Sequence, residues 1–228
     1  MITLAIDLSA DVGSIAVLDN GILLGEEELV RAQNRTAPLM ETIEGLRRNM
    51  GIEWGDVDLF AAGCGPGRYS GLRVALTTVQ HLALPNRRPV RAISSGAALA
   101  AAAGAPDSEM ERILVIGDAR RDRIWCGEFM VVDPFPEPVG DWRLIELTDV
   151  PATFVRSAEQ GRTRVVSAEW ERLQPLLESI NAWESEQWEQ AHGWPKAEWV
   201  ARLAEHEEQA NTPAAPPVPI YLHPPVAR

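Results

Sequence analysis

The chain has 228 residues, which is one large domain or two small ones at roughly 150 residues per domain. Hydrophobic residues make up 46% of the chain and charged residues 24%, as in ordinary globular proteins, which excludes disordered, collagenous and disulfide-stapled classes. The 21 basic and 33 acidic residues give a net charge of −12, which opposes nonspecific binding to nucleic acid or anionic lipid.

The N-terminal half begins with three predicted strands, at residues 4–8, 14–18 and 22–29, and Asn20-Gly21 is typical of the hairpin turn between the last two. A helix is expected over Thr36–Met50, because apolar residues recur there at helical spacing before Gly51. The remaining expected elements of this half are a strand at 57–63, a glycine loop at 64–71, a helix at 72–84, a strand at 90–93 and a helix at 95–103.

The C-terminal half repeats this order. Its expected elements are strands at 112–118, 123–130 and 143–147, a helix at 148–159, a strand at 163–166, and helices at 169–180 and 196–208. The order βββαβαβα therefore appears roughly twice, which predicts duplicated lobes over residues 1–104 and 105–228. From Asn211 the chain is rich in proline and is expected to be extended, with Ile220-Tyr221-Leu222 pinning it to the body.

Membrane and metal functions find little support in the sequence. No apolar run approaches the roughly 18 to 20 residues of a membrane span, and the N-terminus does not resemble a signal peptide, so we expect a cytoplasmic protein with no membrane partner. The four histidines show no ligand spacing, so no metal site is expected. Cys64 and Cys126 are interpreted as buried free thiols, and the tryptophans between residues 170 and 199 as packing groups on acidic surface helices.

The densest motif lies between the strand at 57–63 and the helix that follows it. Its glycines would let backbone amides approach an anion, and the helix N-terminus favours negative charge. The candidate anion- or nucleotide-binding residues of this loop are Gly65, Gly67, Ser70 and Gly71. The spacing matches neither a Walker A loop nor a dinucleotide fingerprint, so a tight strand-to-helix turn is the alternative.

Asp7 and Asp118 each lie at the end of the first predicted strand of their half. Asp7, with Ser9 behind it, is loosely similar to the first phosphate loop of actin-like ATPases, where an acid orients magnesium or water. Asp11 adds a carboxylate where phosphate would sit, which opposes tight nucleotide binding. Beside Asp118, the arginines of residues 120–123 are expected to pair with the local aspartates; an anion or RNA site is the alternative.

Taken together, several segments resemble the bacterial TsaB (YeaZ-type) family. They are Ala5-Ile6-Asp7 with Ser14 to Val17, the run Gly65-Pro66-Gly67-Arg68-Tyr69-Ser70-Gly71-Leu72-Arg73, Asp118-Ala119-Arg120 and Pro219-Ile220-Tyr221-Leu222. The resemblance implies an α/β fold of the actin, sugar-kinase and Hsp70 type (ribonuclease H-like), duplicated, with mixed sheets flanked by helices and a reduced second lobe.

The family resemblance implies a noncatalytic scaffold that heterodimerises with its paralogue TsaD to form threonylcarbamoyladenosine in tRNA. TsaE is the ATPase of that assembly, tRNA is contacted through the complex, and the isolated chain is a candidate homodimer. No cofactor of its own is implied, ATP and Mg²⁺ being assigned to the assembled complex. The pairing face would be the first two helices, with candidate contacts Leu39, Met40, Ile43, Leu46, Arg73, Leu76 and Val79.

Two other functions remain open at this point. The first is an ATP-dependent kinase or hydrolase of the actin-like superfold that uses Asp7 and Asp118 around magnesium. The second is a peptidase, a name attached to relatives of the family. A peptidase requires a metal or an activated nucleophile, and Ser70-Gly71 supplies only half of a serine-hydrolase elbow.

Overall fold

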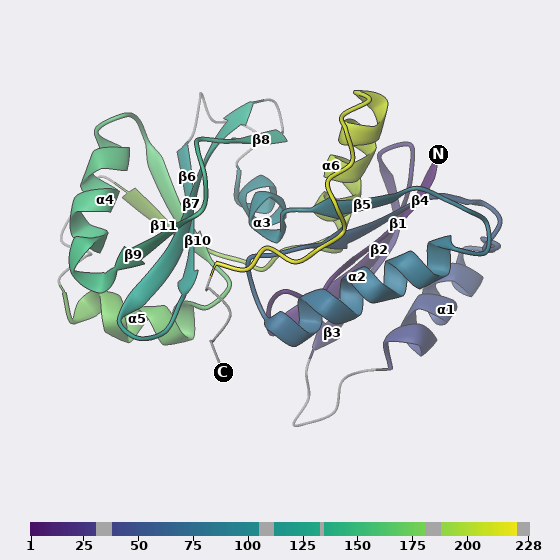
Figure 1. The fold of residues 1–228 in the computed structure, drawn as a ribbon, viewed down its shortest axis with the longest axis horizontal. Helices are drawn as coiled ribbons and strands as arrows, with labels where there is room; N and C mark the ends of the chain where they lie inside the picture. Colours follow the sequence, from purple (N-terminus) through teal and green to yellow (C-terminus); the bar gives the residue numbers. More distant parts are fainter. Residues whose placement is uncertain (31–37, 105–111, 133–134, 181–187, 223–228) are drawn as a thin grey trace. The chain divides into compact units, whose positions relative to one another are not determined.

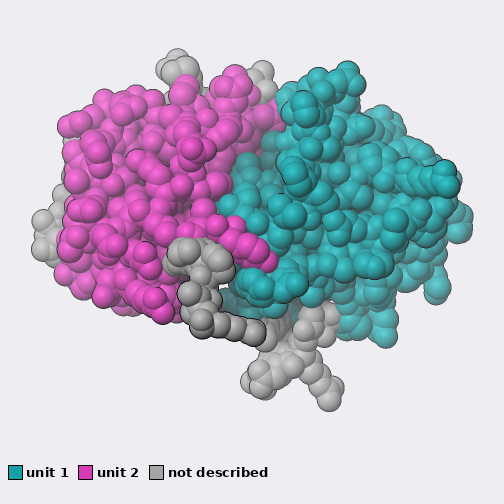
Figure 2. Space-filling model, in the orientation of Figure 1, with its two compact units in different colours: residues 1–98, 194–220 teal, residues 99–193, 221–228 magenta. Residues whose placement is uncertain are grey.

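The computed structural model describes residues 1–30, 38–104, 112–132, 135–180 and 188–222. They form the predicted α/β fold, in which two mixed sheets are flanked by helices (Figure 1). The chain divides into two compact units, which Figure 2 colours separately: unit 1 comprises residues 1–98 and 194–220, and unit 2 comprises residues 99–193 and 221–228.

Unit 1 contains a five-stranded sheet in the order β3-β2-β1-β4-β5. The first three strands are antiparallel neighbours, whereas β4 and β5 continue the sheet in parallel from β1. The strands are β1 (Ile2–Asp7), β2 (Val12–Asp19), β3 (Ile22–Val30), β4 (Val57–Gly63) and β5 (Val90–Ile93). Asn20 and Gly21 both have positive φ, which confirms the predicted hairpin turn.

The helices of unit 1 cover both faces of this sheet (Figure 1). Helices α1 (Leu39–Asn49) and α2 (Tyr69–Ala83) bury their apolar stripes against one face, and α6 (Ala197–Gln209) packs on the other. Helix α3 (Ser95–Ala103) follows β5. The predicted helix start at Thr36 lies outside the described residues.

Unit 2 repeats the strand order of unit 1. Its sheet runs β11-β10-β6-β7-β8, with β9 also paired to β7, so the first strand of the unit is again central. The elements are β6 (Arg112–Asp118), β7 (Arg123–Val132), β8 (Phe135–Pro138), β9 (Arg143–Glu146), a short 3-10 helix (Leu147–Asp149), α4 (Val150–Ala158), β10 (Thr163–Ser167), α5 (Trp170–Glu178) and β11 (Trp188–His192). The shared order confirms the duplication that the sequence predicts.

Three features differ from the sequence-based expectations. Strand β8 was not expected, and neither was β11, whose Trp188 belongs to a strand parallel to β10 and not to a surface helix. Helix α6 belongs to unit 1, whereas we expected every residue from 105 onward in the second lobe. The reason is that α6 packs against β1, β2 and β4.

Both cysteines are buried and free, as predicted. Burial raises the pKa of each thiol to about 12, so both are inert neutral groups. Among the described residues, no helix combines the length and the apolar character needed to cross a membrane.

Candidate functional site

The glycine loop lies between β4 and α2, and it packs closely against the segment that follows β1. The N–H of Arg68 donates to the carbonyl oxygen of Ser9 at 2.8 Å. A Cβ atom on Gly67 would lie 2.5 Å from that same Ser9 oxygen, and one on Gly71 would overlap the carbonyl oxygen of Leu8. These glycines therefore allow the close approach of two protein segments, and the alternative of a tight strand-to-helix turn describes the loop better than an anion cradle.

Gly65 has a φ of +102°, a backbone conformation that residues with a side chain rarely adopt. Its N–H donates to Ser95 Oγ at 3.0 Å, and its carbonyl accepts from the N–H of Ser95 at 2.8 Å. The loop is thus held to the start of α3 as well as to the segment after β1.

Asp7 is completely buried in unit 1. Its Oδ1 accepts hydrogen bonds from the N–H and the hydroxyl of Ser9, at 2.8 and 2.6 Å, while Oδ2 packs over Gly63. Burial raises the pKa of Asp7, and the hydrogen bonds from Ser9 lower it by less. Asp7 therefore braces its own loop through Oδ1.

Asp118 takes the equivalent position in unit 2. Its Oδ1 accepts the N–H of Arg120 at 2.8 Å, and its Oδ2 forms an ion pair with the Arg120 guanidinium at 2.8 Å. Its own N–H donates to Glu169 Oε2 at 2.9 Å, and burial raises the pKa of Glu169. The expected pairing of Arg120 with Asp118 is confirmed; Glu169 was not anticipated, because it lies 51 residues away in sequence.

The alternative of an ATP-dependent kinase or hydrolase requires a nucleotide with Mg²⁺ beside Asp7 and Asp118. Asp7 and Asp118 are the acids expected to orient the metal, and each is engaged by its own loop. Gly67 and Gly71 pack against the backbone of Ser9 and Leu8. The residues of each unit, taken by itself, do not fit that group. Within the described part of the chain, no three His, Cys, Asp or Glu side chains gather as metal ligands.

The expected pairing helices show a different surface from the one predicted. Ile43, Leu46, Leu76 and Val79 are all buried in the core of unit 1, so they are not available to a partner. Each lies on the apolar stripe that its helix turns toward the sheet. The prediction was wrong for these four, because helical periodicity identifies the stripe that faces the protein's own core.

Apolar side chains that lie off this stripe reach the surface. Met40 is 45% exposed, Tyr69 58% and Val74 46%. Arg73 stacks over the Tyr69 ring at 5.2 Å and donates to the Tyr69 hydroxyl at 2.7 Å, and Leu39 is partly buried. We call these five residues the α1–α2 surface. The signal that identifies it is an apolar residue out of phase with the core stripe.

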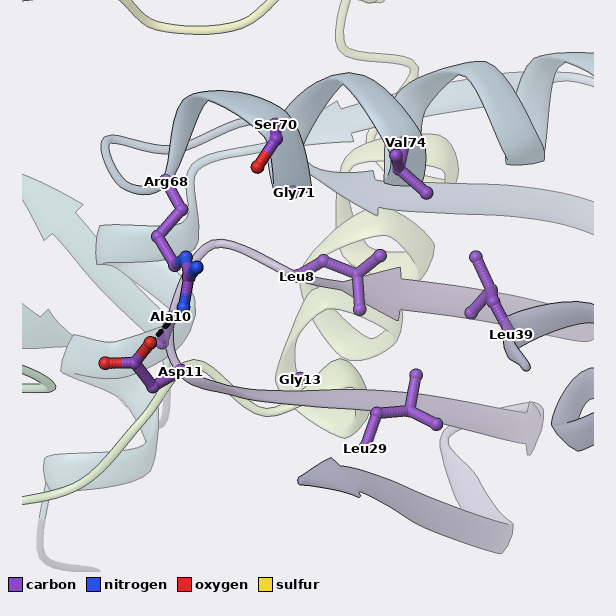
Figure 3. Close-up of a pocket in the computed structure, with 10 residues that line it drawn as sticks. All are labelled: Leu8, Ala10, Asp11, Gly13, Leu29, Leu39, Arg68, Ser70, Gly71 and Val74. Atoms are coloured by element: carbon purple, nitrogen blue, oxygen red, sulfur yellow. Dashed lines mark hydrogen bonds and ion pairs between the residues drawn. The ribbon is translucent and has the colours of Figure 1, made fainter. Parts of the chain in front are cut away.

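A pocket of about 200 Å³ opens beside this surface (Figure 3). The side chains of Leu8, Leu29, Leu39 and Val74 point toward its centre, and Arg68 forms an ion pair with Asp11 on its rim. Ala10, Gly13, Ser70 and Gly71 complete the lining. The wall is aliphatic and the rim charges neutralise each other, so the pocket suits an uncharged apolar group.

Comparison with known proteins places these features in context. A family model described as "TsaD: tRNA N6-adenosine threonylcarbamoyltransferase" matches residues 30–137. Curated proteins named tRNA threonylcarbamoyladenosine biosynthesis protein TsaB also match. The one from Haemophilus influenzae is 32% identical over 55% of this chain and 52% of its own length. The one from Bacillus subtilis is 27% identical over 68% and 70%. The match to the Buchnera aphidicola protein spans 60% of that relative.

Solved structures match over nearly the whole chain. A crystal structure from Pseudomonas aeruginosa, described as an uncharacterised protein with similarity to the peptidase YeaZ, has a TM-score of 0.79 and 25% identity, covering 97% of this chain and 99% of that one. YeaZ from the same organism has a TM-score of 0.78 at 24% identity, with the same coverage.

Proposed function

Because the chain is a homologue of bacterial TsaB proteins, we propose that it acts in the formation of threonylcarbamoyladenosine in tRNA, as a noncatalytic subunit. In this proposal it forms a heterodimer with a TsaD paralogue in the cytoplasm. TsaE is the ATPase of the assembly, and tRNA is reached through the complex. The match of residues 30–137 to the TsaD family model supports descent of the two partners from one fold.

The observation that carries the proposal is the α1–α2 surface with its aliphatic pocket. The pocket is lined by Leu39 and by Val74, which is 46% exposed, and Met40 and Tyr69 are exposed on the same two helices. Exposed apolar and aromatic side chains beside an apolar pocket are the arrangement expected at a protein interface, where such anchors supply most of the binding energy. We propose that a partner helix lies across α1 and α2 and inserts one apolar side chain between Leu39 and Val74.

The absence of catalysis is proposed from the states of Asp7 and Asp118. An ATP-dependent kinase or hydrolase would need both acids free to orient metal and water, yet Asp7 is fully buried and Asp118 is paired with Arg120. The peptidase alternative requires a metal or an activated nucleophile. Among the described residues no cluster of metal ligands is found, and both cysteine thiols are inert.

The test is size-exclusion chromatography with light scattering of the chain, alone and mixed with TsaD from the same genome. Val74→Asp places a charge in the apolar pocket and should weaken the complex by at least roughly tenfold, about 1.4 kcal/mol. Val155→Asp is the matched control, since Val155 is 39% exposed on α4 of unit 2 and does not belong to the α1–α2 surface. A one-to-one complex lost only with Val74→Asp supports the proposal. The absence of a complex, or an equal loss of binding with both variants, contradicts the proposal. A homodimer that excludes TsaD also contradicts it and would show that the α1–α2 surface binds a second copy of this chain.

A further inference from the structure

The segment after α6 runs along unit 1 without helix or strand (Figure 1, yellow). We call residues 212–220 the C-terminal strap. Its first anchor is Arg91 on β5, which is only 6% exposed. The Arg91 guanidinium donates to the carbonyl oxygen of Thr212 at 2.7 Å and forms an ion pair with Glu208 at 2.7 Å. The end of α6 and the start of the strap are thereby fixed to the sheet.

The second anchor lies at the glycine loop. The N–H of Ile220 donates to the carbonyl oxygen of Cys64 at 2.8 Å, and the Ile220 side chain packs against the core cluster that includes Cys64 and Ala75. The carbonyl oxygen of Ile220 lies 3.5 Å from the position that a Cβ on Gly65 would take. Between the anchors, the Gln80 amide on α2 contacts the carbonyl oxygen of Pro217 at 3.5 Å.

The composition of the strap makes it stiff. Pro213, Pro216, Pro217 and Pro219 fix φ and lack N–H donors, so the segment cannot form a helix and loses little entropy when it is held extended. The strap bends once, at Pro217, where the N–H of Val218 donates to the carbonyl oxygen of Pro216 at 2.8 Å. Because the strap is stiff and is bonded at both ends, it holds its two anchoring sites at a fixed separation.

The loop that Ile220 holds forms one wall of the pocket. Cys64 and Gly65 lead directly to Arg68, whose ion pair with Asp11 lies on the rim, and then to Ser70 and Val74 on α2. We propose that the C-terminal strap is a positioning element for the α1–α2 surface: it fixes residues 64–68 and the start of α2 in the arrangement that shapes the pocket. For the identity of the partner this inference rests on the proposed function.

The test compares three variants of the full chain by hydrogen exchange. Ile220→Ala removes the packing, and Ile220→Pro also removes the N–H that bonds Cys64. Val218→Ala is the control on the same strap, because the Val218 side chain is 60% exposed. Both Ile220 variants should speed exchange of the amides of residues 64–72 by at least roughly tenfold, with residues 113–116 unchanged and Val218→Ala like the wild type. Ile220→Val should restore slow exchange.

Binding of TsaD supplies the second readout, measured on the same proteins. Ile220→Ala should weaken the complex severalfold at a temperature at which the variant is still fully folded, and Ile220→Val should restore binding. An unchanged exchange rate at residues 64–72, or a uniform increase in exchange rate across unit 1, would contradict the positioning role of the C-terminal strap. Failure of the wild-type chain to bind TsaD overturns the proposed function alone, since the exchange comparison needs no partner.

Discussion

At the scale of single residues, Gly71 shows why the glycine loop is glycine-rich. It lies in the first turn of α2, where its Cα faces the carbonyl oxygen of Leu8. A phosphate-binding loop would leave such a face open to an anion, whereas here the backbone of the same protein occupies it. The glycine is therefore required by packing.

We predict that Gly71→Ala lowers the free energy of unfolding by about 1–3 kcal/mol, because the new methyl group overlaps backbone that cannot move aside. Gly45→Ala is the matched control: Gly45 lies inside α1 with nothing within 4 Å of an added Cβ, so this change should be neutral or stabilising by up to about 1 kcal/mol. Urea denaturation measures both. Equal effects of the two substitutions would refute the packing role.

Asp7 gives a second prediction at this scale. Its pKa in the folded protein is raised above 3.8, the ordinary value for an aspartate, so the folded state holds the proton more tightly than the unfolded state does. Wild-type stability, relative to Asp7→Asn, should therefore fall as the pH rises from 3.8 through the raised pKa, and should then level off. Urea denaturation of both proteins across about pH 4 to 8 measures this difference. A difference that stays constant, or that grows with pH, would be inconsistent with the burial of Asp7.

Single positions also mark where sequence reasoning ends. The burial of Cys64 and the pairing of Arg120 follow from residue type and local spacing. The separation of surface from core on α1 and α2 does not, because Leu76 and Val74 are equally apolar and only the position of the sheet distinguishes them. The contact between Asp118 and Glu169 depends on tertiary structure alone.

At the scale of elements, α6 is held by residues distant in sequence. Ser14 on β2 accepts the N–H of Ala197 at 2.7 Å, and Glu26 on β3 contacts the N–H of Glu198 at 3.4 Å. These side chains satisfy donors at the first turn of α6 that have no partner within the helix. The cap therefore comes from the sheet that the helix covers.

Ser14→Ala should consequently destabilise the protein by about 1–3 kcal/mol, because it leaves a buried N–H without an acceptor. Ser70→Ala, at an exposed position, should change stability by less than about 0.5 kcal/mol. Thermal unfolding followed by circular dichroism distinguishes the two. If the two variants melt together, Ser14 does not stabilise α6.

Most elements could be predicted to within a few residues because their periods were clear, as in β4 and β5, whose bounds agree with those expected. The exceptions have physical reasons. Strand β8 contains Pro136 and Pro138, which argue against a strand except at a sheet edge, and an edge is where it lies. Strand β11 has little alternation of apolar and polar residues, so only its pairing with β10 identifies it.

At the scale of the whole molecule, the duplicated strand order is the feature that the sequence reveals best. The two sheets share one strand order, except that unit 2 has β9 as an additional strand paired with β7. The assignment of α6 to unit 1 could not be predicted from the sequence. Its amphipathic period shows that one face packs against a sheet, but not which of the two sheets. In both units, the acid at the end of the first strand accepts a hydrogen bond from its own loop.

The most direct test of the central claim measures the modified nucleoside itself. The gene for this chain is deleted in its own bacterium, and threonylcarbamoyladenosine is quantified by mass spectrometry of digested tRNA. We expect the modification to fall and to be restored by the wild-type chain and by Val155→Asp, but not by Val74→Asp. Unchanged modification after deletion, or full restoration by Val74→Asp, would contradict the account.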